Sequence, residues 1–384
     1  MQGYSKIKLP KGEAYVRSDS IKKIASANSI IFDCDGVLVD ASKSYDKAIS
    51  ETVAYLLSIL FGDKFKASAI TDDVIFAFRK SGGFNNDWNT TYAIIMFALS
   101  KTPERLFDVY SKIFEKTNGQ EPNDPYAKLE LVRRTISKEK LRTVIDRRLT
   151  SELVEFAGKL NSKGLQTAES IVFRGSVAKI AMLKLLKEFL CYPEGVTKSV
   201  VVSVFDEHFY GSRLFKKVHG INAKLGIEKG TIQNERLLIE KVTLSKLKEK
   251  FGNAIGMATG RGSIGTFFTL RTVEDYLNPK ALVFLEDIDP KVLEEKKYGK
   301  PEPYALLKAS EPFANGTSVI YVGDSAEDLI MARRASKTKD FVFAAICGND
   351  SLSEKRFDMF SKEKADVIAS SVNDLPLILE RVKN

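Results

Sequence analysis

The sequence has few of the residues that mark disulfide-linked, zinc-binding or membrane proteins. Its 384 residues include 3 Cys, 2 His and 1 Trp. Because Cys34, Cys191 and Cys347 lie far apart in the chain, neither a disulfide framework nor a zinc site is expected. No apolar run reaches the length of a membrane span, and the N-terminal stretch resembles neither a signal peptide nor a transit sequence. We therefore expect a soluble protein in a reducing, cytoplasmic setting.

The basic residues are not gathered into one block. A net charge of +9 arises from 59 Lys and Arg against 50 Asp and Glu, which are spread along many segments. This distribution is typical of a solvated surface, with some attraction for anionic substrates. We expect no nucleic-acid partner and no membrane partner. The histidines, His208 and His219, lie in a Lys-rich helical context and are not expected to bind a metal.

The most informative stretch is residues 29–40, where an apolar run ends in two aspartates and a glycine. Residues 30–32 have the character of a strand buried on both faces. Because side chains alternate along a strand, Asp33 and Asp35 can converge beyond its end, and Gly36 lets the backbone turn away. Two carboxylates so close repel unless a cation, foremost Mg²⁺, neutralises them. Alternatively, both aspartates only cap backbone N–H groups of a turn.

Strand and helix patterns alternate from about residue 250 onward. Short β-like runs are predicted at residues 254–258, 281–285, 318–322 and 341–346, with helices at 264–276, 303–309 and 326–335. This alternation predicts an α/β fold with a doubly wound parallel sheet. The run at residues 29–34 has the same character, so we expect it to be the first strand of that sheet.

Residues 41–240 show mostly helical periodicity and interrupt the sheet after that strand. Helices are predicted at residues 45–61, 73–80, 91–99, 104–115, 127–136 and 178–189. We predict an α/β core domain of residues 1–40 and 241–384, with an N-terminal extension over residues 1–25, and a helical cap domain over residues 41–240. The insertion is expected to act as a lid over the carboxyl ends of the strands, where such folds bind ligands. Alternatively, it is a tethered, independent domain.

Three later strand ends carry residues that complement the aspartate pair. Thr259 and Gly260 offer a hydroxyl and a backbone N–H to an anion at a helix start, although a helix-capping threonine accounts for Thr259 as well. Lys300 precedes a proline that can begin a helix, which would hold the ammonium group as a point charge for phosphate. Asp324 follows a glycine at a strand end and would supply a third carboxylate to the metal. Asp328, one helical turn on, can orient the metal site.

Together these residues resemble the four motifs of the haloacid dehalogenase superfamily of hydrolases, in order. The matching stretches are residues 33–37, Thr259, Lys300 and residues 323–328, and the resemblance covers residues 29–40 and about 235–370. The chain is most similar to the subgroup in which a helical cap follows the first motif. This resemblance implies a Rossmann-like core and a Mg²⁺-dependent phosphatase acting on a small phosphorylated metabolite, such as a sugar or hydroxy-acid phosphate.

The resemblance also implies the chemistry of the first motif. Asp33 would attack phosphorus to form an aspartyl-phosphate, and Asp35 would protonate the leaving alkoxide and later activate water. An acid at this position favours a phosphatase over a dehalogenase, because halide leaves unprotonated. A phosphomutase, or a non-catalytic regulatory protein that binds phosphate or metal, are the alternatives.

The remaining motif residues would hold the ion and the phosphate. Mg²⁺ would be bound by Asp33, the backbone carbonyl of Asp35 and Asp324. The phosphoryl oxygens would be bound by Thr259, Gly260 N–H and Lys300, while Asp328 supports Lys300 or a metal-bound water. These roles follow from the resemblance.

Substrate contacts are predicted at two further places. Asn85, Asn86, Asp87 and Trp88 form a set suited to hydrogen-bonding hydroxyls and stacking on a ring. Alternatively, Asn86 or Asp87 caps the next helix and Trp88 packs in the core of the cap. Arg261 is expected to be either a second anion contact or an exposed arginine at a helix start.

Overall fold

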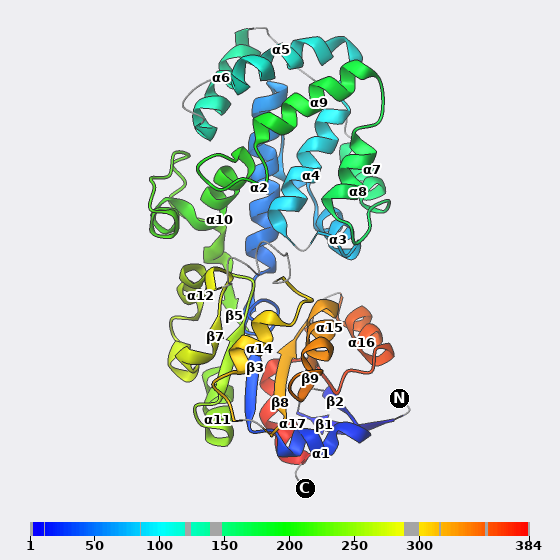
Figure 1. The fold of residues 1–384 in the computed structure, drawn as a ribbon, viewed down its shortest axis with the longest axis vertical. Helices are drawn as coiled ribbons and strands as arrows, with labels where there is room; N and C mark the ends of the chain where they lie inside the picture. Colours follow the sequence, from blue (N-terminus) through cyan, green and yellow to red (C-terminus); the bar gives the residue numbers. More distant parts are fainter. Residues whose placement is uncertain are drawn as a thin grey trace. The chain divides into compact units, whose positions relative to one another are not determined.

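The chain was analysed as a computed structural model, which describes residues 3–10, 12–84, 86–119, 124–138, 148–287, 299–314, 316–349 and 352–382. These residues form two compact units (Figure 1). The core unit comprises Met1–Ser42 and Glu235–Asn384, and the inserted unit comprises Lys43–Asn234. The sequence-based boundaries were 41 and 240, so residues 235–240, predicted as part of the cap, belong here to the core unit.

An eight-stranded sheet runs through the core unit in the order β1-β2-β10-β9-β8-β3-β6-β7. Its strands are β1 (Tyr4–Leu9), β2 (Gly12–Arg17), β3 (Ser29–Phe32), β6 (Ile255–Ala258), β7 (Leu282–Val283), β8 (Val319–Gly323), β9 (Phe341–Ile346) and β10 (Val367–Ala369). From β10 to β7 along the sheet, each strand is parallel to the next. The predicted α/β fold with a mostly parallel sheet is therefore confirmed.

Two strands precede the one expected to come first. The β1–β2 hairpin pairs antiparallel with β10 and forms one edge of the sheet. Ala14 and Val16 of β2 are fully buried, whereas the lysines of β1 face solvent. β3 is the first of the parallel strands, but the expectation that residues 29–34 form the first strand of the sheet is wrong. The β1 and β2 runs were not predicted, because each is short and consists largely of polar and charged residues.

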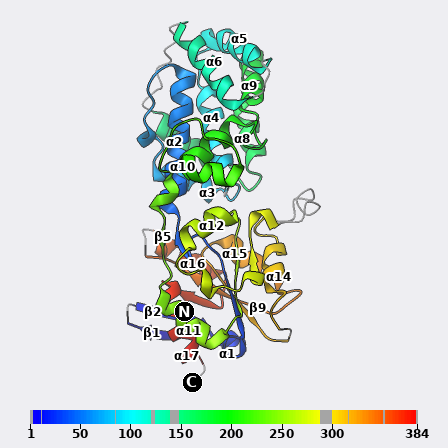
Figure 2. The ribbon, with the colours of Figure 1, turned by 90° about the vertical axis from the view of Figure 1, so that its left-hand side faces the viewer.

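Helices cover both faces of the sheet (Figures 1 and 2). They are α1 (Ile21–Ser26), α11 (Lys241–Phe251), α12 (Ser263–Leu270), α14 (Tyr304–Ser310), α15 (Ala326–Ala335), α16 (Ser353–Lys362) and α17 (Leu375–Arg381). Ile31, Tyr321 and Phe343 pack in one core cluster with side chains of α14, α15 and α16. Their neighbours Ile30 and Ile320 are also buried, and alternation directs them to the opposite face. Burial on both faces explains why the central strands are continuous apolar runs.

A short antiparallel pair marks where the chain leaves and rejoins the core unit. Strand β4 (Val39–Asp40) pairs with β5 (Arg236–Leu237). Gly36, between β3 and β4, has a φ of 74°, and its N–H donates to the carbonyl of Val39 at 2.8 Å. This turn keeps Asp35 close to the end of β3.

The described residues of the inserted unit are helical and include no strand (Figure 1). The helices are α2 (Ser42–Phe61), α3 (Asp72–Lys80), α4 (Asp87–Ser100), α5 (Phe107–Asn118), α6 (Pro125–Lys138), α7 (Leu149–Ala157), α8 (Leu165–Val172), α9 (Val177–Leu190) and α10 (Val200–His219). Helix α4 is buried along most of its length, and α3, α7, α8 and α9 pack around it and one another. Among the described residues, no helix has both the length and the apolar character needed to cross a membrane.

The buried position of β2 predicts that the N-terminal hairpin is needed for stability. Val16→Asp places a carboxylate against β10, and we expect it to lower the free energy of unfolding by roughly 3 kcal/mol or more. Urea denaturation followed by circular dichroism measures this loss. The matched control is Val242→Asp, because Val242 is 55% exposed on α11. If the two variants were equally stable, the result would contradict the packing of the hairpin against β10.

Candidate active site

The predicted site residues of the core unit come from neighbouring strand ends. Asp33 follows β3 and its N–H donates to the carbonyl of Val322 on β8 at 2.8 Å. Thr259 follows β6, and Asp324 follows β8. Since β3 lies between β8 and β6 and the three strands are parallel, their carboxyl ends lie side by side. We call this the carboxyl end of the sheet.

Lys300 lies between two carboxylates at the carboxyl end of the sheet. Its Nζ is 2.7 Å from Asp33 Oδ1 and 2.7 Å from Asp328 Oδ1. The Asp33 and Asp328 side chains are 8% and 0% exposed, so these ion pairs are weakly screened by solvent. Burial alone would lower the pKa of Lys300, but the two carboxylates outweigh it and raise that pKa above its ordinary value. The lysine therefore stays charged in the site.

Asp328 is held from several directions. Its Oδ1 accepts from the Tyr321 hydroxyl at 2.6 Å, and its Oδ2 accepts from the Ser325 hydroxyl at 2.6 Å and the Ser325 N–H at 3.1 Å. Ser325 and Asp328 form a capping box at the start of α15. Burial would raise the pKa of Asp328, but Lys300 and these hydrogen bonds hold it below its ordinary value. Asp328 is thus a fixed anion.

Asp33, Asp324 and Asp328 form a compact acidic cluster, with one carboxylate oxygen of each within 4.8 Å of the others. Burial raises the pKa of Asp33 well above its usual range and that of Asp324 to about 7, despite the attraction of Lys300. One ammonium group does not balance three carboxylates. The site is therefore short of positive charge.

The backbone makes room for this cluster. A Cβ atom on Gly36 would lie 2.0 Å from Asp324 Oδ2, so only glycine fits beside that carboxylate. Buried carboxylates with free oxygen lone pairs are the donors that hard divalent cations prefer. The residues present thus fit a magnesium-type ion, with Asp33 and Asp324 as the side chains that would hold it.

Lys300 is placed differently from expectation. It is not at a helix start, because Pro301 lies in a turn and α14 begins at Tyr304. For Thr259 the helix-capping alternative is excluded, because the N-cap of α12 is Gly262. Instead, the Thr259 hydroxyl accepts from the N–H of Arg261 at 3.2 Å.

The N-terminus of α12 already contacts a carboxylate of the protein. Glu286 Oε1, beyond β7, accepts from the N–H of Ser263 at 2.7 Å and from its hydroxyl. Helix N-termini attract anions, and this carboxylate already accepts from the first residue of α12. Gly260 remains in the turn before it, with nothing within 4 Å of its Cβ position.

Arg261 is buried, with a side chain that is 4% exposed, and it joins two acids. Its Nη1 donates to Asp35 Oδ1 at 2.8 Å, and its Nη2 donates to both carboxylate oxygens of Glu235 at 2.9 and 3.0 Å. Glu235 is fully buried and also accepts from the Thr269 hydroxyl at 2.5 Å. Sequence reasoning missed Glu235 and Tyr321, because nothing in the pattern around them indicates a distant polar partner.

The predicted cap residues have partners within the inserted unit. Asn86 caps α4 by accepting from the N–H of Asn89 at 3.1 Å, and Asp87 pairs with Arg79 at 3.1 Å. Trp88 Nε1 donates to the buried Asp206 Oδ1 at 2.9 Å. These contacts favour the structural alternative for Asn86 and Trp88. Asn85 lies outside the described residues, and the substrate role of the set stays a prediction.

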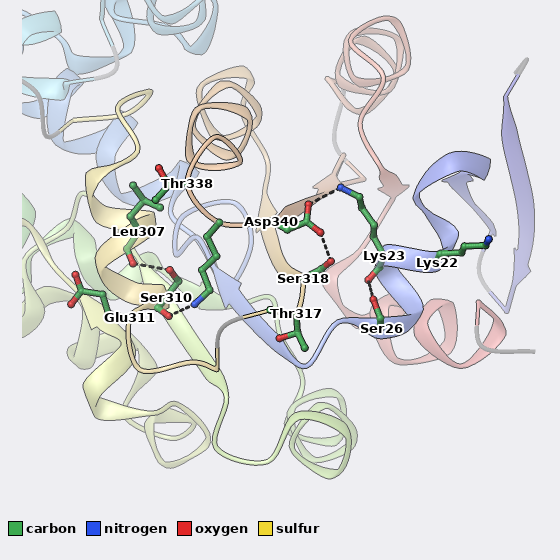
Figure 3. Close-up of a pocket in the computed structure, with 12 residues that line it drawn as sticks. Lys22, Lys23, Ser26, Leu307, Ser310, Glu311, Thr317, Ser318, Thr338 and Asp340 are labelled. Atoms are coloured by element: carbon green, nitrogen blue, oxygen red, sulfur yellow. Dashed lines mark hydrogen bonds and ion pairs between the residues drawn. The ribbon is translucent and has the colours of Figure 1, made fainter.

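A hollow of about 900 Å³ lies at the amino ends of the parallel strands, beside residues that precede β3, β8 and β9 (Figure 3). Three of its charged residues have partners there. Lys23 Nζ is 2.6 Å from Asp340 Oδ1, Ser318 also donates to Asp340, and Lys339 donates to the carbonyl of Ser310. The acidic cluster with Lys300, not this hollow, brings together the residues predicted from the sequence and is the candidate active site.

Comparison with solved structures identifies similar folds. An X-ray structure of a Northeast Structural Genomics Consortium target aligns with a TM-score of 0.65 at 19% identity, over 92% of this chain and 99% of that chain. The fold is shared. Phosphatase Tt82 from Thermococcus thioreducens aligns with a TM-score of 0.48 at 20% identity, over 87% and 98% of the two chains. A hydrolase from Pseudomonas syringae aligns with a TM-score of 0.37 at 15% identity, over 93% and 100%. No family model and no curated protein matches the chain.

The pKa of Asp324 predicts how cation binding depends on pH. Because that pKa is raised to about 7, a proton competes with the ion at low pH. We expect Mg²⁺ binding to tighten from about pH 6 to pH 8, with proton release. Calorimetric titration in two buffers of different ionisation enthalpy measures the affinity and the number of protons released. Asp324→Asn removes one of the side chains that would hold the ion and should weaken binding at both pH values. Without the ion, ionising the Asp324 carboxyl costs free energy in the folded protein, so stability should fall as pH rises from about 4 to about 7 and then level off. Mg²⁺ affinity that does not change with pH would contradict this account.

The contact between Trp88 and Asp206 predicts a structural effect. Trp88→Phe keeps most of the ring but removes one donor from a carboxylate whose side chain is 4% exposed. We expect the free energy of unfolding to fall by about 1–3 kcal/mol. Because Trp88 is the only tryptophan, the unfolding must be followed by circular dichroism rather than fluorescence. Unchanged stability together with a raised KM would instead favour the substrate role.

Proposed function

We propose that this protein is a Mg²⁺-dependent phosphatase of the haloacid dehalogenase type, acting on a small phosphorylated metabolite. The observation that carries the proposal is the position of Lys300 between Asp33 and Asp328, beside Asp324. A lysine with a purely structural role would balance the charge of one buried carboxylate. Three clustered carboxylates, two of them buried, beside a single ammonium group instead suit a site that binds a cation and a phosphoryl group.

Asp33 is the nucleophile in this proposal. One carboxylate oxygen forms a bond to phosphorus while the bond from phosphorus to the leaving oxygen breaks, which gives an aspartyl-phosphate. Lys300 holds the carboxylate of Asp33 through their ion pair and stabilises the negative charge on the phosphoryl oxygens. When bound, Mg²⁺ supplies the positive charge that lets two anions approach.

Asp35 supplies and then recovers a proton. It donates the proton to the leaving oxygen in the first step and takes one from the water that hydrolyses the aspartyl-phosphate in the second. Its side chain is 37% exposed, so it is open to a substrate. Thr259 and the N–H of Gly260 lie in the turn after β6 and complete the set of donors for the phosphoryl group.

Substrate choice belongs to the inserted unit in this proposal. The unit is continuous in sequence and leaves the core unit directly after the turn that carries Asp35. It would act as a lid that excludes water and contacts the part of the metabolite beyond its phosphate.

Phosphate release from 4-nitrophenyl phosphate and a panel of phosphorylated metabolites tests the proposal. We expect turnover with Mg²⁺ that is lost on chelation, and Asp33→Asn should lower kcat by at least about a thousandfold, because the nucleophile is removed. Trapping of acid-stable aspartyl-phosphate is expected in the wild type alone. The control is Asp340→Asn. Asp340 directly precedes β9, at the amino ends of the parallel strands, so this variant should keep full activity.

Three results would count against hydrolysis by Asp33. Binding of Mg²⁺ and phosphate without turnover on any substrate would favour the regulatory alternative. Isomerisation of a sugar phosphate that requires a bisphosphate primer would favour a phosphomutase. Full activity of Asp33→Asn would remove Asp33 from the mechanism.

A further inference from the structure

Asp35 is held by a guanidinium group that is itself clamped. Arg261 Nη1 donates to Asp35 Oδ1 at 2.8 Å, while its Nη2 contacts both oxygens of Glu235. The Thr269 hydroxyl on α12 fixes Glu235 from its other side. The planar fork of an arginine has a defined direction for each N–H, so this clamp sets the direction of the bond to Asp35.

The backbone of Arg261 is fixed as well. Its N–H donates to the Thr259 hydroxyl at 3.2 Å, and its carbonyl accepts from the N–H of Leu285 at 3.0 Å. The side chain is 4% exposed, against 37% for Asp35. Its charge is shared by two carboxylates, so it does not suit a second anionic group on the substrate.

We propose that Arg261, clamped by Glu235, is a positioning residue that orients Asp35 for proton transfer to the leaving oxygen. The inference rests on the function proposed above. Because an N–H of Arg261 occupies a lone pair of Oδ1, Oδ2 is the oxygen that is directed to exchange a proton with the leaving group. That proton passes to the leaving oxygen as its bond to phosphorus breaks, and Asp35 becomes a carboxylate that later accepts a proton from water.

The leaving group separates this role from a purely structural one. 4-Nitrophenolate is a stable anion and needs little protonation as it leaves, whereas an alkoxide needs a full proton. kcat/KM reports only the steps up to release of the leaving group, so it excludes the later hydrolysis. A positioning defect must therefore lower kcat/KM much more for an alkyl phosphate than for 4-nitrophenyl phosphate.

The experiment measures both substrates with Mg²⁺ for the wild type, Arg261→Gln, Arg261→Lys and Glu235→Gln. General acid catalysis contributes about 10²- to 10⁴-fold, so we expect alkyl phosphate kcat/KM to fall by about ten- to a hundredfold in each variant, with a much smaller fall for 4-nitrophenyl phosphate. Lysine keeps the charge but lacks the fork, so it should restore stability better than it restores alkyl phosphate turnover.

The controls distinguish the possible failures. Arg261→Gln leaves Glu235 buried without its partner and is prone to unfold; Glu235→Gln removes the clamp without leaving a buried charge and carries the test in that case. Arg333→Gln breaks a matched but exposed pair with Glu363 and should change neither substrate. Equal losses on both substrates in the folded variants would overturn the positioning role and leave the phosphatase intact. A wild type that hydrolyses neither substrate would overturn the proposed function and this inference with it.

Discussion

The contact of Lys300 with Asp33 and Asp328 is the interaction on which the rest of the site depends. A carboxylate at the end of a strand buried on both faces has little water around it, so its charge must be met by protein groups or an ion. Lys300 meets part of that charge, and Tyr321 and Ser325 hold Asp328 so that the lysine has a fixed partner. The remaining imbalance of charge is what would draw a cation to the cluster.

A second charge system lies on the other side of Asp35. Arg261 joins Asp35 to Glu235, and Glu235 is fully buried. Burial raises the pKa of Glu235, while Arg261 opposes that shift. The two aspartates of the first motif thus have separate counter-ions, Lys300 for Asp33 and Arg261 for Asp35. Separate partners would let the two neighbouring carboxylates take the different roles proposed above.

The sequence predicted the features that arise from local patterns. Apolar runs identified β3, β6, β7, β8 and β9, and the expected parallel topology placed Asp33 and Asp324 at the carboxyl end of the sheet. Strand β10 and the β1–β2 hairpin were missed, because the pairing of β2 with β10 joins residues at opposite ends of the chain. Glu235 was assigned to the cap because its contact with Arg261 is set by the fold and leaves no local pattern. The contact of Glu286 with Ser263 at the start of α12 is a tertiary contact of the same kind.

The antiparallel pairing of β2 with β10 has a consequence for synthesis of the chain. Val16 pairs with Val367, so the edge of the sheet can form only when nearly all of the protein has been made. The inserted unit is one continuous segment, Lys43–Asn234, that is compact by itself. A ribosome therefore completes this whole segment before it makes β6 and β8, the two neighbours of β3. The hairpin of β1 and β2 can pair at once, but β3 has no strand partner until the second half of the chain is synthesised, so the site at its end is among the last parts of the protein to be assembled.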